Sequence, residues 1–193
     1  MSDSHLPKKN IQTISGSGNF MAGGNITQKY YTKKKNTMKA LIAAYKKEQS
    51  EDIEFYSIIE ELNYYLKPIK SESEKVIGLE KKLQDGHLEH LVDFALEAKD
   101  LFARKVDKHR LSRTAQEIFV FILGDIWRLF NHQIYPLIIS NTDYSEIMEK
   151  IDKEIIDKIN LKLEDNVLNI YNDCITGMIY FLTGNCHIKW SKS

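Results

Sequence analysis

Apolar residues recur at steps of three and four along most of this 193-residue chain, and this period constrains the fold more than any other feature. Beyond residue 36, no segment alternates apolar and polar residues with the period of two that is typical of a half-buried strand. The chain is 42% hydrophobic, which is enough to build a core. We therefore predict an all-α fold, with a helical bundle of about five to six helices at residues 37–193 and a short glycine-rich arm at residues 1–36.

Proline, glycine and capping residues divide the periodic pattern into separate helices. The expected helices cover residues 53–66, 73–84, 88–102, 112–136, 143–159 and 167–182. A further apolar run at residues 38–45 either begins the first helix early or forms a helix of its own. Residues 117–139 are apolar on nearly every side, so we expect them in the middle of the bundle or at a helix–helix interface.

The arm and the body differ in charge, although Lys+Arg and Asp+Glu balance at 27 each. Residues 1–47 contain nine lysines and one acidic residue, a net charge of +8, so the remainder carries −8. No apolar run reaches the roughly 18 residues that a membrane-spanning helix needs, and two cysteines cannot make a disulfide scaffold. These features predict a soluble cytoplasmic protein with a basic arm and an acidic body.

Glycine and asparagine alternate with apolar residues in the arm. Glycine permits tight chain reversal while Ile, Thr and Phe favour extended backbone, so the arm could form short strands joined as a β-arc. A lone arc has too few strands to be stable, whereas stacked copies would pair each other's backbone groups. We interpret the arm as a homo-oligomeric assembly motif, with a flexible tail and a phosphate-binding loop as alternatives. The motif residues are Ile14, Gly16, Gly18, Asn19, Phe20, Met21, Gly23, Gly24, Asn25 and Ile26.

A run of three lysines, Lys33, Lys34 and Lys35, follows two tyrosines at the end of the arm. Such a cluster could track phosphates while a tyrosine stacks on a base. A nucleic-acid-binding adaptor that uses residues 29–47 is therefore the alternative function. A solvated linker that keeps the arm in solution is the simpler interpretation of the same run.

Residues that could carry chemistry are few and do not form a complete motif. Cys174 and Cys186 are twelve residues apart with no C-x-x-C pair, and a buried thiol is the simplest interpretation. His87 and His90, taken with Cys186 and His187, would be the only basis for a metal-dependent enzyme. His132 is expected to be a core or interface histidine. We predict no catalytic residue, no metal and no cofactor.

Four strings stand out in the body: Gly78–Leu83, Ala115–Ile118, Ile134–Ile138 and, at the end of the chain, Gly177–Trp190. These strings resemble signatures of the bacterial ABC-three-component conflict systems. The arm is similar to the glycine–asparagine motif often placed at the start of such proteins, and to the prion-like motifs of bacterial amyloid signalling. The signature residues near the chain end are Gly184, Asn185, Cys186, His187 and Trp190.

The resemblance implies an operon with an ABC-type ATPase and a middle component that defends against phage or other invading DNA. Family members often carry a separate effector domain before the helical module, and here only the short arm precedes it. The chain has no ATP-binding motif, so the ATPase is expected as a partner.

From the residues we expect a non-enzymatic adaptor that oligomerises through its arm and docks other system components through apolar surface on residues 117–139 and the C-terminal segment. Ile188 and Trp190 are expected to fold back as an apolar plug after a reversal at Gly184–Asn185.

Overall fold

The computed structural model of the protein describes residues 37–69 and 78–192, all of which lie in the unit Lys35–Ser193. Every regular element within these residues is a helix, as the sequence predicts. The expected assembly motif and the three-lysine run lie outside the described residues, so the structure does not test either.

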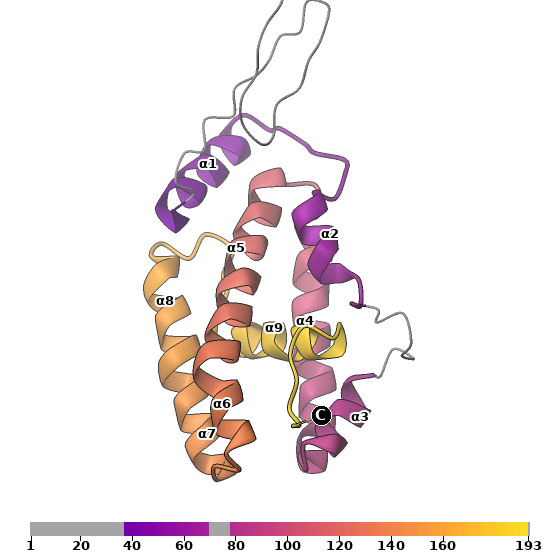
Figure 1. Cartoon of the computed structure of the whole chain (residues 1–193). Helices are drawn as coiled ribbons and strands as arrows, with labels where there is room; N and C mark the ends of the chain where they lie inside the picture. The colour runs from indigo at the N-terminus through magenta and orange to yellow at the C-terminus, as the bar shows by residue number, and fades with distance from the viewer. Residues whose placement is uncertain (1–36, 70–77, 193) are drawn as a thin grey trace, which may run out of the picture. The chain divides into compact units, whose positions relative to one another are not determined.

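Two long helical rods lie side by side in the bundle, and each is interrupted by one π-helical turn (Figure 1). The first rod consists of α5 (Arg113–Leu129), the π turn η2 (Phe130–Ile134) and α6 (Tyr135–Ile139). The second consists of α7 (Tyr144–Ile151), the π turn η3 (Asp152–Ile156) and α8 (Asp157–Leu163). Side-chain caps start both rods: Ser112 accepts the N–H of Ala115, and Asp143 accepts the N–H of Ser145.

The remaining helices pack around these rods (Figure 1). They are α1 (Met38–Ser50), α2 (Glu60–Leu66), α3 (Leu79–Asp85), the short 3-10 turn η1 (Glu89–Leu91), α4 (Val92–Lys108) and α9 (Asn172–Gly184). Both α1 and α2 pack against α5, whereas α3 packs against α4 and α9. The first turn of α1 is capped by Thr37, whose side chain accepts the N–H of Ala40.

The closest helix pair is α4 and α9, which cross each other near Gly177 (Figure 1). A Cβ atom built at Gly177 would lie 2.2 Å from the carbonyl oxygen of Ala98 and 3.3 Å from the Cβ of Phe102. Only glycine lets the two backbones come so near. Ala95 and Ala98, both buried, present the matching small surface on α4.

The position in the middle of the bundle that was expected for residues 117–139 is confirmed for one side of residues 117–134, which is buried in the core, but α6 has no buried residue and Trp127, Pro136 and Ile139 are exposed. On α5, Ile118, Phe119, Ile122, Leu123 and Ile126 are all at most 1% exposed. Because α5 has neighbours on several sides, including α1, α2 and α9, a helix that is apolar nearly all round can bury its side chains within one chain.

Several predicted helix bounds are wrong, among them the end of the helix over residues 88–102, because α4 continues to Lys108. Residues 53–58 are not helical, because Asp52 adopts a positive φ of 50° and Phe55 donates its N–H to the carbonyl of Leu111 instead. Residues 167–171 are also irregular, held by the side chain of Asn166, which bonds both backbone groups of Ile170. Lastly, the first rod continues past Pro136.

The continuation past Pro136 has a local cause. Proline has no N–H to donate to the preceding turn, and a regular α-helix would place its ring against a carbonyl. The π turn η2, which directly precedes α6, widens the helix there and lets it run on to Ile139.

Candidate functional site

The chain reverses sharply at the end of α9, as the sequence predicts. His187 donates its N–H to the carbonyl of Leu182, and Cys186, with a φ of 65°, donates to the carbonyl of Thr183. These bonds satisfy the last carbonyls of the helix and turn the chain back along it. Ile188 is fully buried and Trp190 is 4% exposed, which confirms the expected plug.

The Trp190 side chain is held by polar and aromatic contacts. Its indole Nε1 donates to the hydroxyl of Thr183 at 3.0 Å, and its ring meets Phe130 edge-on at 5.0 Å between centroids. A Cβ at Gly86 would lie 2.8 Å from the carbonyl oxygen of Trp190, so glycine is required where α3 ends against the plug. The tryptophan therefore joins the end of α9 to η2 and to the end of α3.

Lys82 and Asn185 tie two other elements to the end of α9. The ammonium of Lys82 bonds the carbonyl of Thr183 and lies 3.0 Å from the Sγ of Cys186, where a cation also complements the negative end of the helix. The side-chain amide of Asn185 donates to the carbonyl of Tyr65 at 2.9 Å, and the backbone carbonyl of Asn185 accepts the N–H of Ile69 at 3.1 Å. The signature residues thus fasten α2 and α3 to α9.

His187 is the exception in this turn, because both of its ring nitrogens are buried without a hydrogen-bond partner. The ring lies 5.1 Å from the ring of Tyr64 and 5.2 Å from that of Tyr65. Burial lowers the pKa of His187 below its usual value, although nearby backbone carbonyls, first that of Tyr65, act in the opposite direction. A histidine in this position is neutral and contributes by packing.

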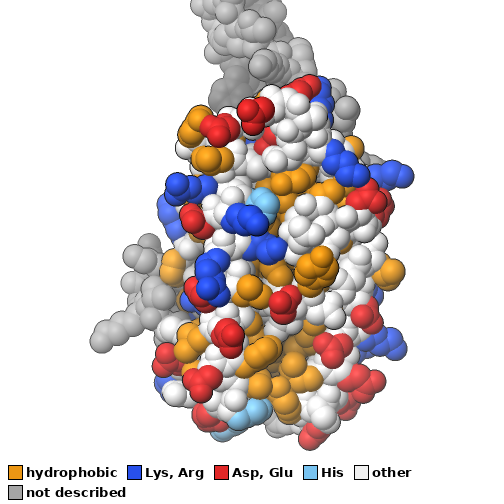
Figure 2. Space-filling view, turned by 180° about the vertical axis from the view of Figure 1, so that it is seen from behind, with side chains coloured by type: hydrophobic (Ala, Val, Ile, Leu, Met, Phe, Trp, Pro, Cys, Tyr) orange, Lys and Arg blue, Asp and Glu red, His pale blue; other side chains and the backbone are white. Residues whose placement is uncertain are grey.

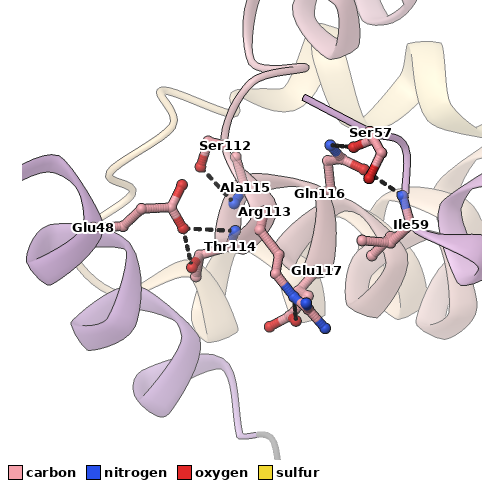
Figure 3. Close-up of polar contacts among 9 residues, drawn as sticks. All are labelled: Glu48, Ser57, Ile59, Ser112, Arg113, Thr114, Ala115, Gln116 and Glu117. Atoms are coloured by element: carbon pink, nitrogen blue, oxygen red, sulfur yellow. Dashed lines mark hydrogen bonds and ion pairs between the residues drawn. The ribbon is translucent and has the colours of Figure 1, made fainter. Parts of the chain in front are cut away.

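A second polar cluster lies where α1 meets the start of α5 (Figure 3). Glu48 is 8% exposed, and its Oε2 accepts both the N–H of Thr114, at 2.9 Å, and the hydroxyl of the same residue. A carboxylate here caps the first turn of α5 together with Ser112 and complements the positive end of that helix. We call these residues, with the adjoining 52–58 segment, the α1–α5 junction.

Gln116 joins three segments at the same junction (Figure 3). Its Oε1 accepts the N–H of Ile59 at 2.8 Å, and its Nε2 donates to the carbonyls of Ser57 and Arg110, at 2.9 and 2.7 Å. The residue is 1% exposed. It holds the irregular segment before α2 in place, so residues 53–59 of the predicted helix are not helical whereas residues 60–66 form α2.

Glu48 also borders a cavity of about 320 Å³, and its other oxygen, Oε1, is buried without a hydrogen-bond partner. Sequence reasoning missed this residue. The signal was present, because Glu48 follows an apolar stripe at helical spacing, where an acid is unexpected. The stripe consists of Met38, Leu41, Ile42 and Tyr45.

The histidines and cysteines singled out from the sequence do not form one site. Cys174 is buried, as expected, and burial raises its pKa to about 11, whereas Cys186 is partly exposed. His132 is exposed, so the first of its two predicted positions, in the core, is wrong, and its position at an interface stays a prediction. Within residues 37–69 and 78–192, no group of three or more His, Cys, Asp or Glu residues is placed to hold a metal ion.

A further cavity, of about 430 Å³, lies between the end of α3 and the start of α7. His87, Asp85 and Tyr144 contribute to its lining, and the ring of His90 contacts Tyr144 at 5.4 Å between centroids. The pKa of Tyr144 is raised by burial. His87 and His90 are thus grouped with a tyrosine, and not with Cys186 and His187, whose contacts are with Lys82, Tyr64 and Tyr65.

The basic segment enters the described residues only at its end, on α1. Lys46 forms an ion pair with Asp165 at 2.5 Å, and Lys47 pairs with Glu51 at 3.6 Å. Much of the positive charge on this part of α1 is therefore balanced by neighbouring carboxylates. Among the described residues, no helix is both long and apolar enough to cross a membrane.

Comparison with known proteins gives one family. A family model described as C-terminal domain 9 of the ABC-three component (ABC-3C) systems matches residues 78–190. Comparison with curated proteins gives no match, and comparison with solved structures gives none either. The matched range runs from the start of α3 to the buried tryptophan and so contains all four strings that carried the resemblance. The chain therefore belongs to the ABC-3C C-terminal domain 9 family, and through it to the components of ABC-three-component systems.

Proposed function

We propose that the chain is a non-enzymatic adaptor of an ABC-3C defence system, in which the body docks other components and the arm associates between copies. The observation that carries this proposal is the use of the signature residues. Lys82, Asn185 and Trp190 all bond to groups within the chain: Lys82 and Asn185 join α3 and α2 to the end of α9, and Trp190 bonds Thr183 of α9. Residues that bond within the chain in this way stabilise a scaffold, and an adaptor requires a stable scaffold whose outer surfaces can bind partners.

Exposed hydrophobic side chains on the outside of the bundle could form the docking surface. Figure 2 shows one face of the molecule, on which hydrophobic side chains gather between acidic and basic ones. The apolar side chains of residues 117–139 are largely used inside the bundle, and Trp127 (43% exposed) and Ile139 (47%) are the large ones most available to a partner. Other large exposed hydrophobic residues are Phe94, Leu96, Leu161 and Tyr171. Scattered residues of this kind are common on protein surfaces, so their role must be measured.

Co-expression with the other components of the system tests the docking role. Replacing Trp127 with Asp adds a charge where an adaptor would bury an aromatic ring, and we expect the complex recovered by affinity purification to fall at least tenfold. Lys153→Asp, on an element that the proposal does not use, is the control. Equal recovery of the complex with both variants would exclude Trp127 from the interface.

The role of the arm rests on its sequence and calls for a separate test. Ile14→Asp with Ile26→Asp keeps the length of the arm and places charges in the neutral glycine–asparagine stretch. We expect light scattering to show a larger species for the unchanged protein than for this variant, because like charges stacked in register repel each other. The same size distribution for both proteins at every concentration would contradict assembly through the arm.

The nucleic-acid alternative is tested in the same preparations. Lys33, Lys34 and Lys35 replaced by Glu should abolish binding to single-stranded or duplex DNA at low salt if the run tracks phosphates. Binding that is absent in the unchanged protein, or that does not weaken as salt rises, would remove this function. We rank it second because Lys46 and Lys47, on the described part of the segment, are already paired with carboxylates.

A further inference from the structure

The segment that joins α1 to α2, residues 51–59, is not helical although its sequence favours a helix, and we call it the hinge. Ile53, Tyr56 and Ile59 recur at steps of three and continue the apolar stripe of α1. The helix stops at Asp52, whose φ of 50° lies in the left-handed region that disfavours residues with a Cβ. Local sequence preference and tertiary structure therefore disagree in the hinge.

The hinge also leaves large hydrophobic side chains in solvent. Ile53 is 53% exposed, Tyr56 is 79% exposed and Ile58 is 50% exposed. Single exposed hydrophobic residues are common, whereas three within one short segment form a patch. In a helical hinge, Ile53 and Tyr56 would lie on one face, so an arrangement that makes the hinge helical and covers this face is favoured by the hydrophobic effect.

α1 itself is a peripheral helix that packs on α5 and α8 (Figure 1). One buried oxygen of Glu48 has no hydrogen-bond partner, which lowers the free energy needed to detach the helix. The family match begins at residue 78, so α1 lies outside the matched domain. These features favour the release of α1 as a unit, with the hinge as the point where the chain bends.

We propose that α1 exchanges between two copies of this chain. In the exchanged dimer α1, the hinge and α2 form one continuous helix, and α1 of each copy lies on α5 and α8 of the other. The contacts of α1, such as the bond from Thr114 to Glu48, are remade between the copies, because both copies offer the same surface. The partner is a second copy, since the surface beneath α1 already fits this helix.

The exchange replaces some hydrogen bonds and adds apolar burial. The N–H of Phe55 leaves its present carbonyl partner, and Gln116 releases the backbone of the hinge. In a continuous helix the hinge N–H groups donate to carbonyls four residues earlier, and the freed amide of Gln116 is hydrated. Ile53 and Tyr56 then pack against the same residues of the second copy, because the two hinges meet where the chains cross.

The test uses the full chain with Ile14→Asp and Ile26→Asp, so that association of the arm does not contribute. Unlabelled and isotopically heavy copies are mixed in equal amounts, unfolded in urea and refolded together at high concentration, because α1 must detach before it exchanges. Size-exclusion chromatography separates dimer from monomer. A zero-length carbodiimide cross-linker then joins the amine of Lys46, on α1, to the carboxylate of Asp165, with which it forms an ion pair at 2.5 Å.

Mass spectrometry of the link between Lys46 and Asp165 decides which copy supplies α1. In the exchanged dimer this link joins two copies, so we expect mixed-isotope links to be as frequent as same-isotope links. In the monomer every link joins residues of one chain and carries one isotope. A dimer in which all of these links are same-isotope, or the absence of a dimer at every concentration, would overturn the proposal.

Two substitutions at Asp52 shift the balance in opposite directions. Asp52→Gly relieves the left-handed backbone and weakens a helical hinge, whereas Asp52→Ala does the reverse. We expect the dissociation constant of the dimer to be at least about tenfold lower for Asp52→Ala than for Asp52→Gly. Equal constants would refute the role of the hinge. If either variant fails to fold, the cross-linking result with Asp52 in place still decides.

The matched control is Asn141, whose φ is 56° in the turn before α7. Asn141→Gly and Asn141→Ala make the same backbone changes outside the hinge and should leave the dissociation constant unchanged. A shift at Asn141 as large as that at Asp52 would mean that the dimer does not depend on the hinge.

The outcome is separable from that of the proposed function. Light scattering that contradicts assembly through the arm leaves the exchanged dimer unaffected, because the cross-linked chain carries the altered arm. Conversely, larger species of the unchanged protein, with only same-isotope links in the arm variant, would support assembly through the arm and remove the exchange of α1.

Discussion

The turn after α9 and the α1–α5 junction both contain buried polar groups, but the two regions differ in how many of these groups have hydrogen-bond partners. In the turn, Lys82, Asn185 and Trp190 all find partners within the chain. At the junction, Gln116 is fully bonded, whereas Glu48 keeps one oxygen unpaired beside a cavity. Satisfied groups stabilise the fold, whereas a buried polar group that has no partner lowers its stability.

The two unpaired groups also differ from each other. His187 can give up its charge at little cost, since its ordinary pKa lies close to neutral pH, and its neutral ring then packs between Tyr64 and Tyr65. Glu48 is instead a carboxylate that lines a cavity. His187 therefore contributes by packing, whereas the unpaired oxygen of Glu48 is a cost that the junction carries.

The largest effect is expected at the buried tryptophan. Trp190→Ala should lower the free energy of unfolding by about 3–5 kcal/mol, because it empties the volume between Phe130 and Gly86 and leaves Thr183 without its donor. Urea unfolding followed by circular dichroism measures this change. Trp127→Ala removes the same side chain from a site that is 43% exposed and should cost half as much or less. Equal losses would show that the plug does not carry the stability assigned to it.

Next comes the helix crossing. Gly177→Ala places a methyl group against the Ala98 carbonyl and should cost about 1–3 kcal/mol, because α4 and α9 must move apart. Gly78→Ala is the matched control: a Cβ there meets nothing within 4 Å, so its change should stay within about 0.5 kcal/mol. Urea unfolding of both variants measures these changes. An unchanged unfolding free energy for Gly177→Ala would show that α4 and α9 can move apart at little cost.

At the α1–α5 junction, one substitution separates the contribution of the Gln116 hydrogen bonds from that of its side-chain volume. Gln116→Leu keeps most of the side-chain volume but removes three hydrogen bonds, and we expect a loss of about 1–3 kcal/mol as the N–H of Ile59 is left unpaired. Amide exchange around Ile59 should quicken at the same time. Gln84→Leu, at an exposed position on α3, is the control. Unchanged exchange near Ile59 would show that Gln116 does not hold this segment.

The smallest effect concerns pH. Burial lowers the pKa of His187, so the folded chain takes up a proton less readily than the unfolded chain. Its contribution is fully present above about pH 6.5, the ordinary pKa of histidine, and is lost as the pH falls from there through the lowered value. His187→Phe keeps an aromatic ring between the two tyrosines and removes this loss.

The measurement compares unfolding free energies at pH 7.5 and 5.0 for both proteins. We expect His187→Phe to lose less stability on acidification than the unchanged chain, with some loss remaining because the pKa of His109 is lowered as well. His87→Phe changes an exposed ring and should leave the pH dependence unaltered. A variant that loses as much stability as the unchanged chain would assign the dependence to other groups.

Much of the fold could be predicted from local sequence signals. The helical period, the helix starts at residues 112 and 143 and the reversal at Gly184–Asn185 each depend on neighbouring residues, and all three are confirmed. The end of α6 was not predictable in this way. A proline alone indicates a stop, and the wider π turn before it allows the helix to continue.

The candidate site was harder to predict, because its parts come from distant positions. Glu48 and Thr114 are 66 residues apart, and Gln116 meets Ser57 and Ile59 across a similar separation. Gln116 and Lys82 lay within strings that carried the family resemblance, but neither string indicates which backbone group the side chain bonds. Glu48 could have been noticed as an acid on an apolar stripe, although its unpaired oxygen could not.

By itself the sequence determined the helical class, the division into a basic arm and an acidic body, and the family, since these follow from period, composition and short strings. Only the tertiary structure decided which polar residues are satisfied and which face a cavity. The reason is physical: hydrogen-bond partners and solvent exclusion depend on segments far apart in the chain, whereas helix formation and capping depend on residues a few positions away.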